Sequence, residues 1–255
     1  MNLRFCSLAL LCFASAGLLQ AETFREPFNE VRPLSPAGRV EVDNTNGAIT
    51  VRTWDRNEVR IAGEKVASDQ DALQDLQVEI EATPDSVVVR AKKLHRSWLS
   101  IFDWRRSESI RFDLMVPAGA RLDSIHTVNG AVDIAGVNGA VRASSVNGAV
   151  HATGLGGGAH ISTVNGAVHA EFASAAIHEP LSFSTVNGAI MVMLPRSALV
   201  EARTSTVNGR VVSDFPSARR GDAERASDDL KGRPIDFSAH TVNGAITVRA
   251  VPDKI

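Results

Sequence analysis

The chain has 255 residues, a formal net charge of −2 and no tyrosine. A charge so near zero does not indicate a nucleic-acid partner or strong attraction to an anionic membrane surface. Both cysteines, Cys6 and Cys12, lie close to the N-terminus. We therefore expect no disulfide framework and no thiolate metal site in the rest of the chain.

The N-terminal segment has the pattern of a secretory signal. A positive charge precedes a largely apolar run, residues 5–19. We place the cleavage after Ala21, which makes residues 1–21 the signal peptide, with a cut after Ala16 as the alternative. A lipoprotein signal is disfavoured because Cys12 lies inside the apolar run. No later segment is long and apolar enough to span a bilayer, so we predict an exported protein of the periplasm or cell surface.

Residues 22–116 read as a β-rich N-terminal cap. Its first part, residues 22–36, is expected to be irregular because it contains three prolines. A short helix is expected at Asp69–Leu76, with Ser68 as its N-cap. Alternation of apolar and polar residues predicts the strands Gly38–Val42, Ala48–Trp54, Glu58–Gly63, Leu76–Ala82, Ser86–Lys92 and Ser109–Val116.

One short phrase, Val-Asn-Gly-Ala-Val or a close variant, recurs after residue 116 up to the end of the chain, and one further copy lies near the start. The segment NGAITVR occurs identically at Asn46–Arg52 and Asn243–Arg249. Such periodicity means that one structural unit is stacked many times, with a rung of roughly 18–22 residues. The turn pairs are Asn46-Gly47, Asn129-Gly130, Asn138-Gly139, Asn147-Gly148, Asn165-Gly166, Asn187-Gly188, Asn208-Gly209 and Asn243-Gly244.

Each Asn-Gly pair stands between two short alternating segments and predicts a turn in which glycine supplies a positive φ. Around the first of the rungs, Ile125, Thr127, Val132 and Ile134 share one face, and His126 and Asp133 share the other. A flat meander and a β-solenoid both fit this parity. We favour the solenoid, because stacking explains why the same residues return at every turn.

Stacked asparagine side chains are expected to hydrogen-bond along their column. Five alanines of the phrase are small enough for a narrow interior, and we expect them to line it. They are Ala131, Ala140, Ala149, Ala167 and Ala189. The predicted fold class is therefore all-β, a β-solenoid of Asn-Gly repeats over residues 117–255 that follows the β-rich cap.

The polar segment 213–234 interrupts the repeat and is expected to be an insertion or loop. Residues Phe237–Val251 return to the repeat and are expected to close the stack. The cap at the other end has a physical purpose, because a bare terminal rung would expose unpaired strand edges.

Three parts of the sequence carry a family resemblance: Gly38–Arg52 (GRVEVDNTNGAITVR), Trp54-Asp55-Arg56 with Glu58-Val59, and the break Val116–Gly119 before the Thr-Val-Asn-Gly rungs. In these features the chain resembles the bacterial DUF4097 family, described as adhesins. The resemblance implies a β-solenoid in an exported, adhesin-like protein. The chain departs from the family pattern in having Ala after Asn-Gly almost throughout, where the family often has Asp.

The repeat offers no paired acids of the kind that polysaccharide lyases and hydrolases use. Its outward positions hold Asp133, Arg142, His151 and His169. We therefore predict a non-enzymatic protein with no catalytic residues and no cofactor, and keep a carbohydrate-active enzyme as the third hypothesis.

His151 and His169 occupy the same repeat position, so stacking makes them neighbours. Two adjacent imidazoles can bind Zn²⁺ or Cu²⁺. We favour the alternative, solvent-exposed strand residues and no metal site, because the sequence supplies no third ligand. The tripeptide Arg220-Gly221-Asp222 matches an integrin-binding motif but is interpreted as a chance match.

The segment His95–Ser107 gathers aromatic and basic residues between two strands. Such residues are typical of contact surfaces, although a lid that folds back over one end of the solenoid is the interpretation we slightly favour. The candidate contact residues are Trp98, Phe102, Trp104, Arg105 and Arg106. The first functional hypothesis is an adhesin-like or scaffold protein; the second is a module in envelope homeostasis that binds a protein or glycan through this loop.

Overall fold

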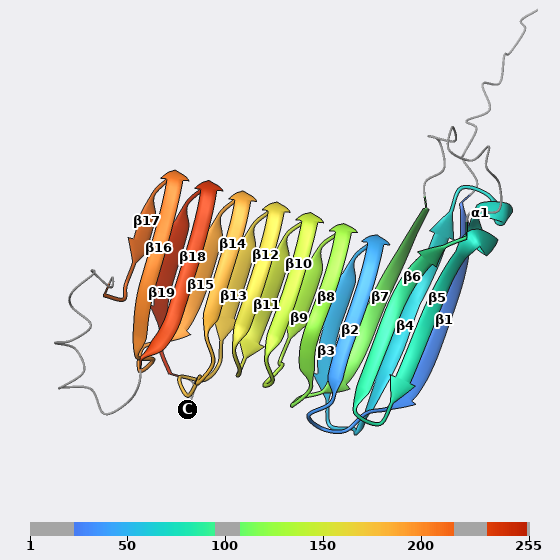
Figure 1. Cartoon of the computed structure of the whole chain (residues 1–255), viewed down its shortest axis with the longest axis horizontal. Helices are drawn as coiled ribbons and strands as arrows, with labels where there is room; N and C mark the ends of the chain where they lie inside the picture. The colour runs from blue at the N-terminus through green and yellow to red at the C-terminus, as the bar shows by residue number, and fades with distance from the viewer. Residues whose placement is uncertain (1–22, 95–107, 217–233, 254–255) are drawn as a thin grey trace, which may run out of the picture.

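A computed structural model describes residues 23–94, 108–216 and 234–253. The proposed signal peptide, the Trp98–Arg106 contact residues and Arg220-Gly221-Asp222 lie outside the described residues. Within the described ranges the chain forms two large sheets and one short helix, α1 (Gln70–Asp75) (Figure 1). The predicted all-β class is confirmed.

Most neighbouring strands within each sheet are parallel, and both sheets run along the whole length of the body. Among the described residues one sheet has ten strands and the other nine. The ten-stranded sheet contains, in spatial order, β1 (Phe24–Pro33), β4 (Glu58–Ala67), β7 (Glu108–Pro117), β3 (Ile49–Trp54), β9 (Val132–Ala135), β11 (Val150–Leu155), β13 (Val168–Phe172), β15 (Ile190–Pro195), β19 (Ile246–Val251) and β17 (Val211–Ser213). The nine-stranded sheet contains β16 (Val200–Asn208), β18 (Ile235–Asn243), β14 (Leu181–Asn187), β12 (Ala159–Asn165), β10 (Val141–Asn147), β8 (Arg121–Asn129), β2 (Arg39–Asn46), β6 (Ser86–Lys93) and β5 (Leu76–Thr83).

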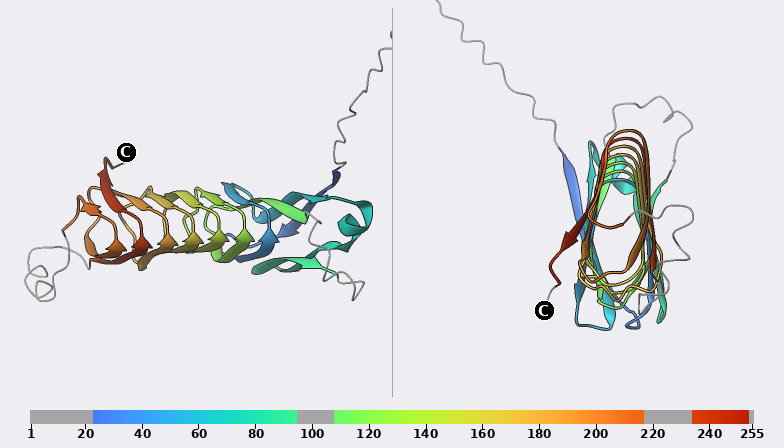
Figure 2. Two further views of the ribbon diagram at one scale, coloured as in Figure 1. Left: turned by 90° about the horizontal axis from the view of Figure 1, so that it is seen from above. Right: turned by 90° about the vertical axis from the view of Figure 1, so that its left-hand side faces the viewer.

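Through the repeats the chain alternates between the sheets. Strand β8 lies in one sheet, β9 in the other, and β10 returns to pair with β8 in parallel. We call two such strands joined by an Asn-Gly turn a rung. Seen end on, the rungs superimpose as a flattened loop with the Asn-Gly turns at one narrow side (Figure 2). Equivalent residues of neighbouring rungs are in register, for example Asn147 with Asn165.

The order of rungs in space departs from the order in sequence at both ends. The rung β18–β19 is inserted between β14–β15 and β16–β17, so that β16–β17 is outermost. Likewise β2 lies between β6 and β8, and β3 between β7 and β9. The expectation that Phe237–Val251 closes the stack is therefore wrong. The two identical heptapeptides, Asn46–Arg52 and Asn243–Arg249, both belong to inserted rungs.

The space between the sheets is filled by large apolar side chains. Ile125, Thr127, Val132 and Ile134 are all at most 2% exposed, which confirms the predicted inner face. Three phenylalanines from the later rungs meet there, with ring centroids 6.3 Å apart for Phe172 and Phe183 and 5.5 Å apart for Phe183 and Phe237. The prediction of an alanine-lined interior is wrong.

The alanines of the phrase are instead half-buried or exposed because they follow the glycine at the turn, outside the two sheets. The strand that comes after the turn begins one residue later, and the inward position is the following Val or Ile. The interior is consequently wider than a stack of small residues would make it.

Antiparallel pairing marks the end of the body opposite the outermost rung. Strand β1 pairs with β4 along its whole length, which overturns the expectation that residues 22–36 are irregular. Proline is tolerated in β1 because it is an edge strand, where some N–H groups need no partner. The N-cap of α1 is Asp69, whose carboxylate accepts from the backbone N–H of Ala72 at 2.7 Å, in place of the predicted Ser68.

Candidate functional site

Seven of the predicted turn asparagines stand in one column along the narrow side of the body. Each Nδ2 donates to Oδ1 of the preceding asparagine in the stack, with distances of 2.7 to 3.0 Å. The column runs Asn46, Asn129, Asn147, Asn165, Asn187, Asn243 and Asn208. All six bonds point the same way, so within the described residues no asparagine donates to Oδ1 of Asn208 at the end of the column.

The eighth predicted turn, Asn138-Gly139, lies at the opposite narrow side of the body. The backbone N–H of Asn138 donates to the carbonyl of Ala118 at 2.7 Å. One rung further on, Gly156 takes the equivalent place, and a Cβ there would lie 2.6 Å from Oδ1 of Asn138. The connections on this side vary in sequence and length, which explains why the rung period ranges between 18 and 22 residues.

The glycines of the turns are required by close packing between rungs. Among the described residues, only Gly47 of these turn glycines has a positive φ, so the predicted reason for glycine is wrong for the other copies. A Cβ at Gly148 would lie 1.9 Å from the carbonyl oxygen of Gly130, and one at Gly166 2.1 Å from that of Gly148. Stacked turns are so close that only a hydrogen fits between them.

In six of the seven rungs of the described residues a Thr or Ser hydroxyl satisfies the glycine carbonyl of the neighbouring turn. Ser145 Oγ donates to the carbonyl of Gly130 at 2.9 Å, and Thr163 Oγ1 to that of Gly148 at 2.8 Å. The neighbouring Asn and Ala carbonyls accept backbone N–H groups, as Asn147 and Ala149 do. Four further hydroxyls donate to the glycine carbonyl of a neighbouring turn in the same way: those of Thr127, Thr185, Thr206 and Thr241. The working repeat is therefore Thr/Ser-Val-Asn-Gly, in which the Thr or Ser and the Gly are bonding partners in adjacent rungs.

The valine before six of the seven stacked asparagines points outward from the nine-stranded sheet; Asn46 alone is preceded by Thr45. Val164 and Val186 are each 40% exposed, Val242 41% and Val207 75%. Because the residues on both sides of these valines are in register, the valines form one row, which we call the valine stripe. Its members are Val128, Val146, Val164, Val186, Val242 and Val207. It lies beside the asparagine column, so one edge of this face presents apolar groups next to amides.

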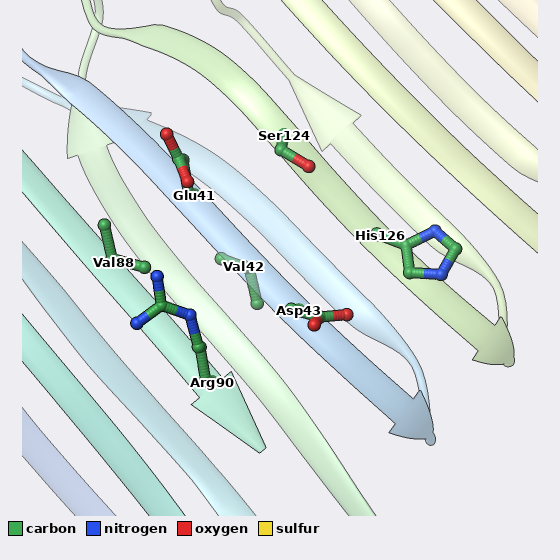
Figure 3. A pocket seen from close by; sticks show the side chains of 7 residues that line it. All are labelled: Glu41, Val42, Asp43, Val88, Arg90, Ser124 and His126. Carbon is green, nitrogen blue, oxygen red and sulfur yellow. The ribbon is translucent and has the colours of Figure 1, made fainter. Parts of the chain in front are cut away.

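An open groove of about 260 Å³ lies on the same face, where β6, β2 and β8 are adjacent (Figure 3). Glu41 and Asp43 extend from β2 on either side of the inward Val42, and Arg90 extends from β6. The Arg90 guanidinium is 3.0 Å from Glu81. The groove therefore presents two outward carboxylates and is suited to polar contact with a ligand on an open surface.

Asp43, His126 and Ser144 occupy one row across three adjacent strands. His126 Nδ1 is 2.9 Å from Ser144 Oγ, but no ion pair within 4.0 Å joins Asp43 to His126 in the part of the chain that is described. Ser144 is in register with partners on both sides, so its backbone belongs to two ladders. These three residues therefore do not assemble as a charge relay with an oxyanion site.

His151 and His169 are direct neighbours in β11 and β13, with ring centroids 6.0 Å apart and ring planes inclined at 45°. Asp133 and Met191 continue the same row on either side of the pair. The described residues hold no group of three or more His, Cys, Asp or Glu side chains placed to bind one metal ion.

The described residues also contain no helix long and apolar enough to cross a membrane.

A proposed cell adhesion protein from Clostridium sporogenes has a similar structure, with a TM-score of 0.53 and 12% identity over 89% of this chain and 100% of that chain. Two proposed adhesins, from Bacteroides fragilis and Parabacteroides distasonis, match with TM-scores of 0.34 and 0.28 and identities of 13% and 11%; they cover 88% and 87% of this chain and 97% of each of those chains. No family model and no curated protein matches the sequence. The likeness to the Clostridium protein shows a shared fold.

The sequence predicted the stacking of the asparagines, but it predicted neither the groove nor the bonds between hydroxyls and glycine carbonyls. The groove depends on β6 lying beside β2, a contact between segments that share no repeat. The hydroxyl bonds had a signal, because Thr or Ser stands two residues before Asn in six of the turns.

Proposed function

We propose that this chain is an exported, non-enzymatic protein of the bacterial envelope, a β-solenoid of the DUF4097 type with an adhesin-like or scaffold role. In this proposal residues 1–21 are a secretion signal and residues 22–116 cap one end. Residues 117–255 form the solenoid, and 213–234 is an insertion within it. The partner is an envelope protein or a glycan.

The observation that carries the proposal is the valine stripe beside the asparagine column. Four of the six valines of the stripe are 40% exposed or more, so much of their apolar surface gains nothing from burial in the fold, and the repetition points to contact with another molecule. Apolar groups next to amides suit a partner with both apolar and hydrogen-bonding groups. The in-register backbone holds these groups at a spacing of about 4.8 Å without an ordering cost on binding.

The shape of the body supports the same role. The long axis is built from repeated in-register rungs, so the exposed face is stiff and extended (Figure 1). Similarity of fold to a proposed cell adhesion protein agrees with the proposal, although fold by itself does not assign function.

The test is attachment of the purified protein to envelopes of the cell that produces it, measured as the bound fraction. The double variant Val164→Glu/Val186→Glu places two charges on the stripe and should reduce binding at least tenfold. The matched control is Met191→Glu/Thr247→Glu, two adjacent outward residues of the opposite sheet, and it should bind as the unaltered chain does.

Equal loss in both variants would contradict a role for the stripe. The double variant Trp98→Ala/Trp104→Ala separates the second hypothesis from the first. Loss of binding in that variant alone would assign recognition to the loop and overturn the stripe as the contact surface. Circular dichroism of each variant establishes that the β fold is retained.

A further inference from the structure

The two stacked histidines of β11 and β13 are placed as metal ligands are placed. Against the interpretation favoured from the sequence alone, we propose that His151 and His169 form a two-histidine binding site for a late first-row divalent metal ion, Cu²⁺ or Zn²⁺, on the outer face of the ten-stranded sheet. The site is independent of the valine stripe, which lies on the other sheet.

The separation of the rings fits one shared ion. With a metal–nitrogen distance of about 2.0–2.1 Å, a bound ion lies roughly 3.2 Å from the centroid of each imidazole, so the centroids of two ligating rings are roughly 5 to 6.4 Å apart. The centroids of His151 and His169 are 6.0 Å apart. In the proposed site, rotation about the side-chain bonds directs one nitrogen of each ring at a common point.

Neither ring has a competing partner. In the described residues no hydrogen bond or ion pair joins either imidazole to another side chain. The repeat contains a contrast in His126 and His240, whose Nδ1 atoms lie 2.9 and 2.7 Å from the hydroxyl oxygens of Ser144 and Ser205. In these two pairs the serine hydroxyl occupies a ring nitrogen, whereas the rings of His151 and His169 face each other with no such bond among the described residues.

The strands hold the pair in place. Val150, Ala152, Val168 and Ala170 flank the two histidines in sequence, and each is at most 1% exposed. Anchored backbone on both sides lowers the entropy that must be lost when the ion binds. His151 itself is exposed, so an ion can reach it from solvent.

The residues in register with the two histidines on the adjacent strands, Asp133 and Met191, influence which metal ion binds. Asp133 adds a negative charge on one side, and Met191 adds a thioether, a ligand that copper accepts, on the other. Because no third His, Cys, Asp or Glu within the described residues completes the group, water fills the remaining positions. Imidazole ligands favour Cu²⁺ and Zn²⁺ over lighter divalent metals, and Cu²⁺ binds tightest by the Irving–Williams order.

The test is titration of the full chain with Cu²⁺ by calorimetry, together with electron paramagnetic resonance of the bound ion. We expect one ion per chain and a signal from two coordinating nitrogens. His151→Ala and His169→Ala should each raise the Kd at least tenfold and remove one nitrogen from the signal. The matched control is His160→Ala, an exposed histidine of the other sheet whose row neighbours are Arg142 and Ser182.

Unchanged binding in His151→Ala or His169→Ala would overturn the proposal, as would an equal loss in His160→Ala. Thermal unfolding without metal establishes that each variant is folded, so a weaker Kd reports the lost ligand. Since all three histidines face outward, we expect their melting temperatures to remain close to that of the unaltered chain.

Discussion

The smallest repeated device in this molecule is the bond between a buried hydroxyl and the glycine carbonyl of the adjacent rung. The glycine lets the turns approach until a Cβ would overlap the neighbouring carbonyl oxygen. That approach removes the carbonyl from water, and the Thr or Ser hydroxyl restores its hydrogen bond. The two residues therefore depend on each other, and only at Gly47 does the backbone conformation itself also require glycine.

The isosteric change Thr163→Val should lower the free energy of unfolding by about 1–3 kcal/mol, because it leaves the buried carbonyl of Gly148 without its donor. The measurement is urea unfolding followed by circular dichroism. The control Thr247→Val changes an outward, half-buried threonine and should stay within about 0.5 kcal/mol of the unaltered chain. Equal effects of the two changes would show that the hydroxyl bond contributes nothing.

At this scale the sequence predicted the inward face around Asn129 and the stacking of seven asparagines, because both follow from a period of two and a repeated phrase. It misplaced the alanines of the phrase, because they lie at the turns, where the period of two is interrupted. The reason for glycine was not predictable from one copy. Asn-Gly is ordinary hairpin chemistry, and only the approach of a second rung shows that the carbonyl of the neighbour excludes a Cβ at Gly148.

At the scale of the strands, the sequence does not determine which rung lies next to which. Every copy of the phrase carries the same asparagine in the same register, so the phrase itself does not distinguish β16 from β18 as the neighbour of β14. One residue marks the outermost rung: Arg210 stands where the phrase otherwise has Ala, and no strand of the described residues stacks beyond this rung. A long charged side chain is tolerated there and also discourages further edge-to-edge pairing.

Engineered cysteines should report this order. In a chain carrying Cys6→Ser and Cys12→Ser, the pair Ser184→Cys/His240→Cys joins residues that are in register in adjacent strands. Their Cα atoms are about 4.8 Å apart, within disulfide range, and mild oxidation should crosslink them. The pair Ser184→Cys/Ser205→Cys spans two strand spacings, about 9.6 Å, and should not form the bond.

Mobility on non-reducing gels distinguishes the two pairs. Crosslinking of Ser184→Cys/Ser205→Cys in place of the first pair would mean that β16 lies directly beside β14, in the order of the sequence. The insertion of β18 between them would then be wrong.

At the scale of the whole molecule, the repeat made the alternating two-sheet body predictable, whereas the ends were not. Residues 24–33 read as irregular because of their prolines, yet they form an edge strand once β4 supplies an antiparallel partner. The groove near Asp43 was equally hidden, since it depends on β2, β6 and β8 meeting at that end. Sequence periodicity describes the interior of a stack, and its ends are decided by contacts between segments that do not repeat.

An interior rung should consequently be removable as a unit. Deletion of residues 148–165 joins Asn147 to Gly166, restores the phrase and leaves strands alternating between the sheets. We expect a folded, less stable protein, because each rung contributes its own packing and its two interfaces. Deletion of residues 148–156 removes half a rung, brings β10 directly before β12 and places two strands of one sheet in succession. That shorter deletion should abolish the cooperative urea transition although it removes fewer residues. If the half-rung deletion were the better tolerated of the two, the rung would not be the unit from which this body is built.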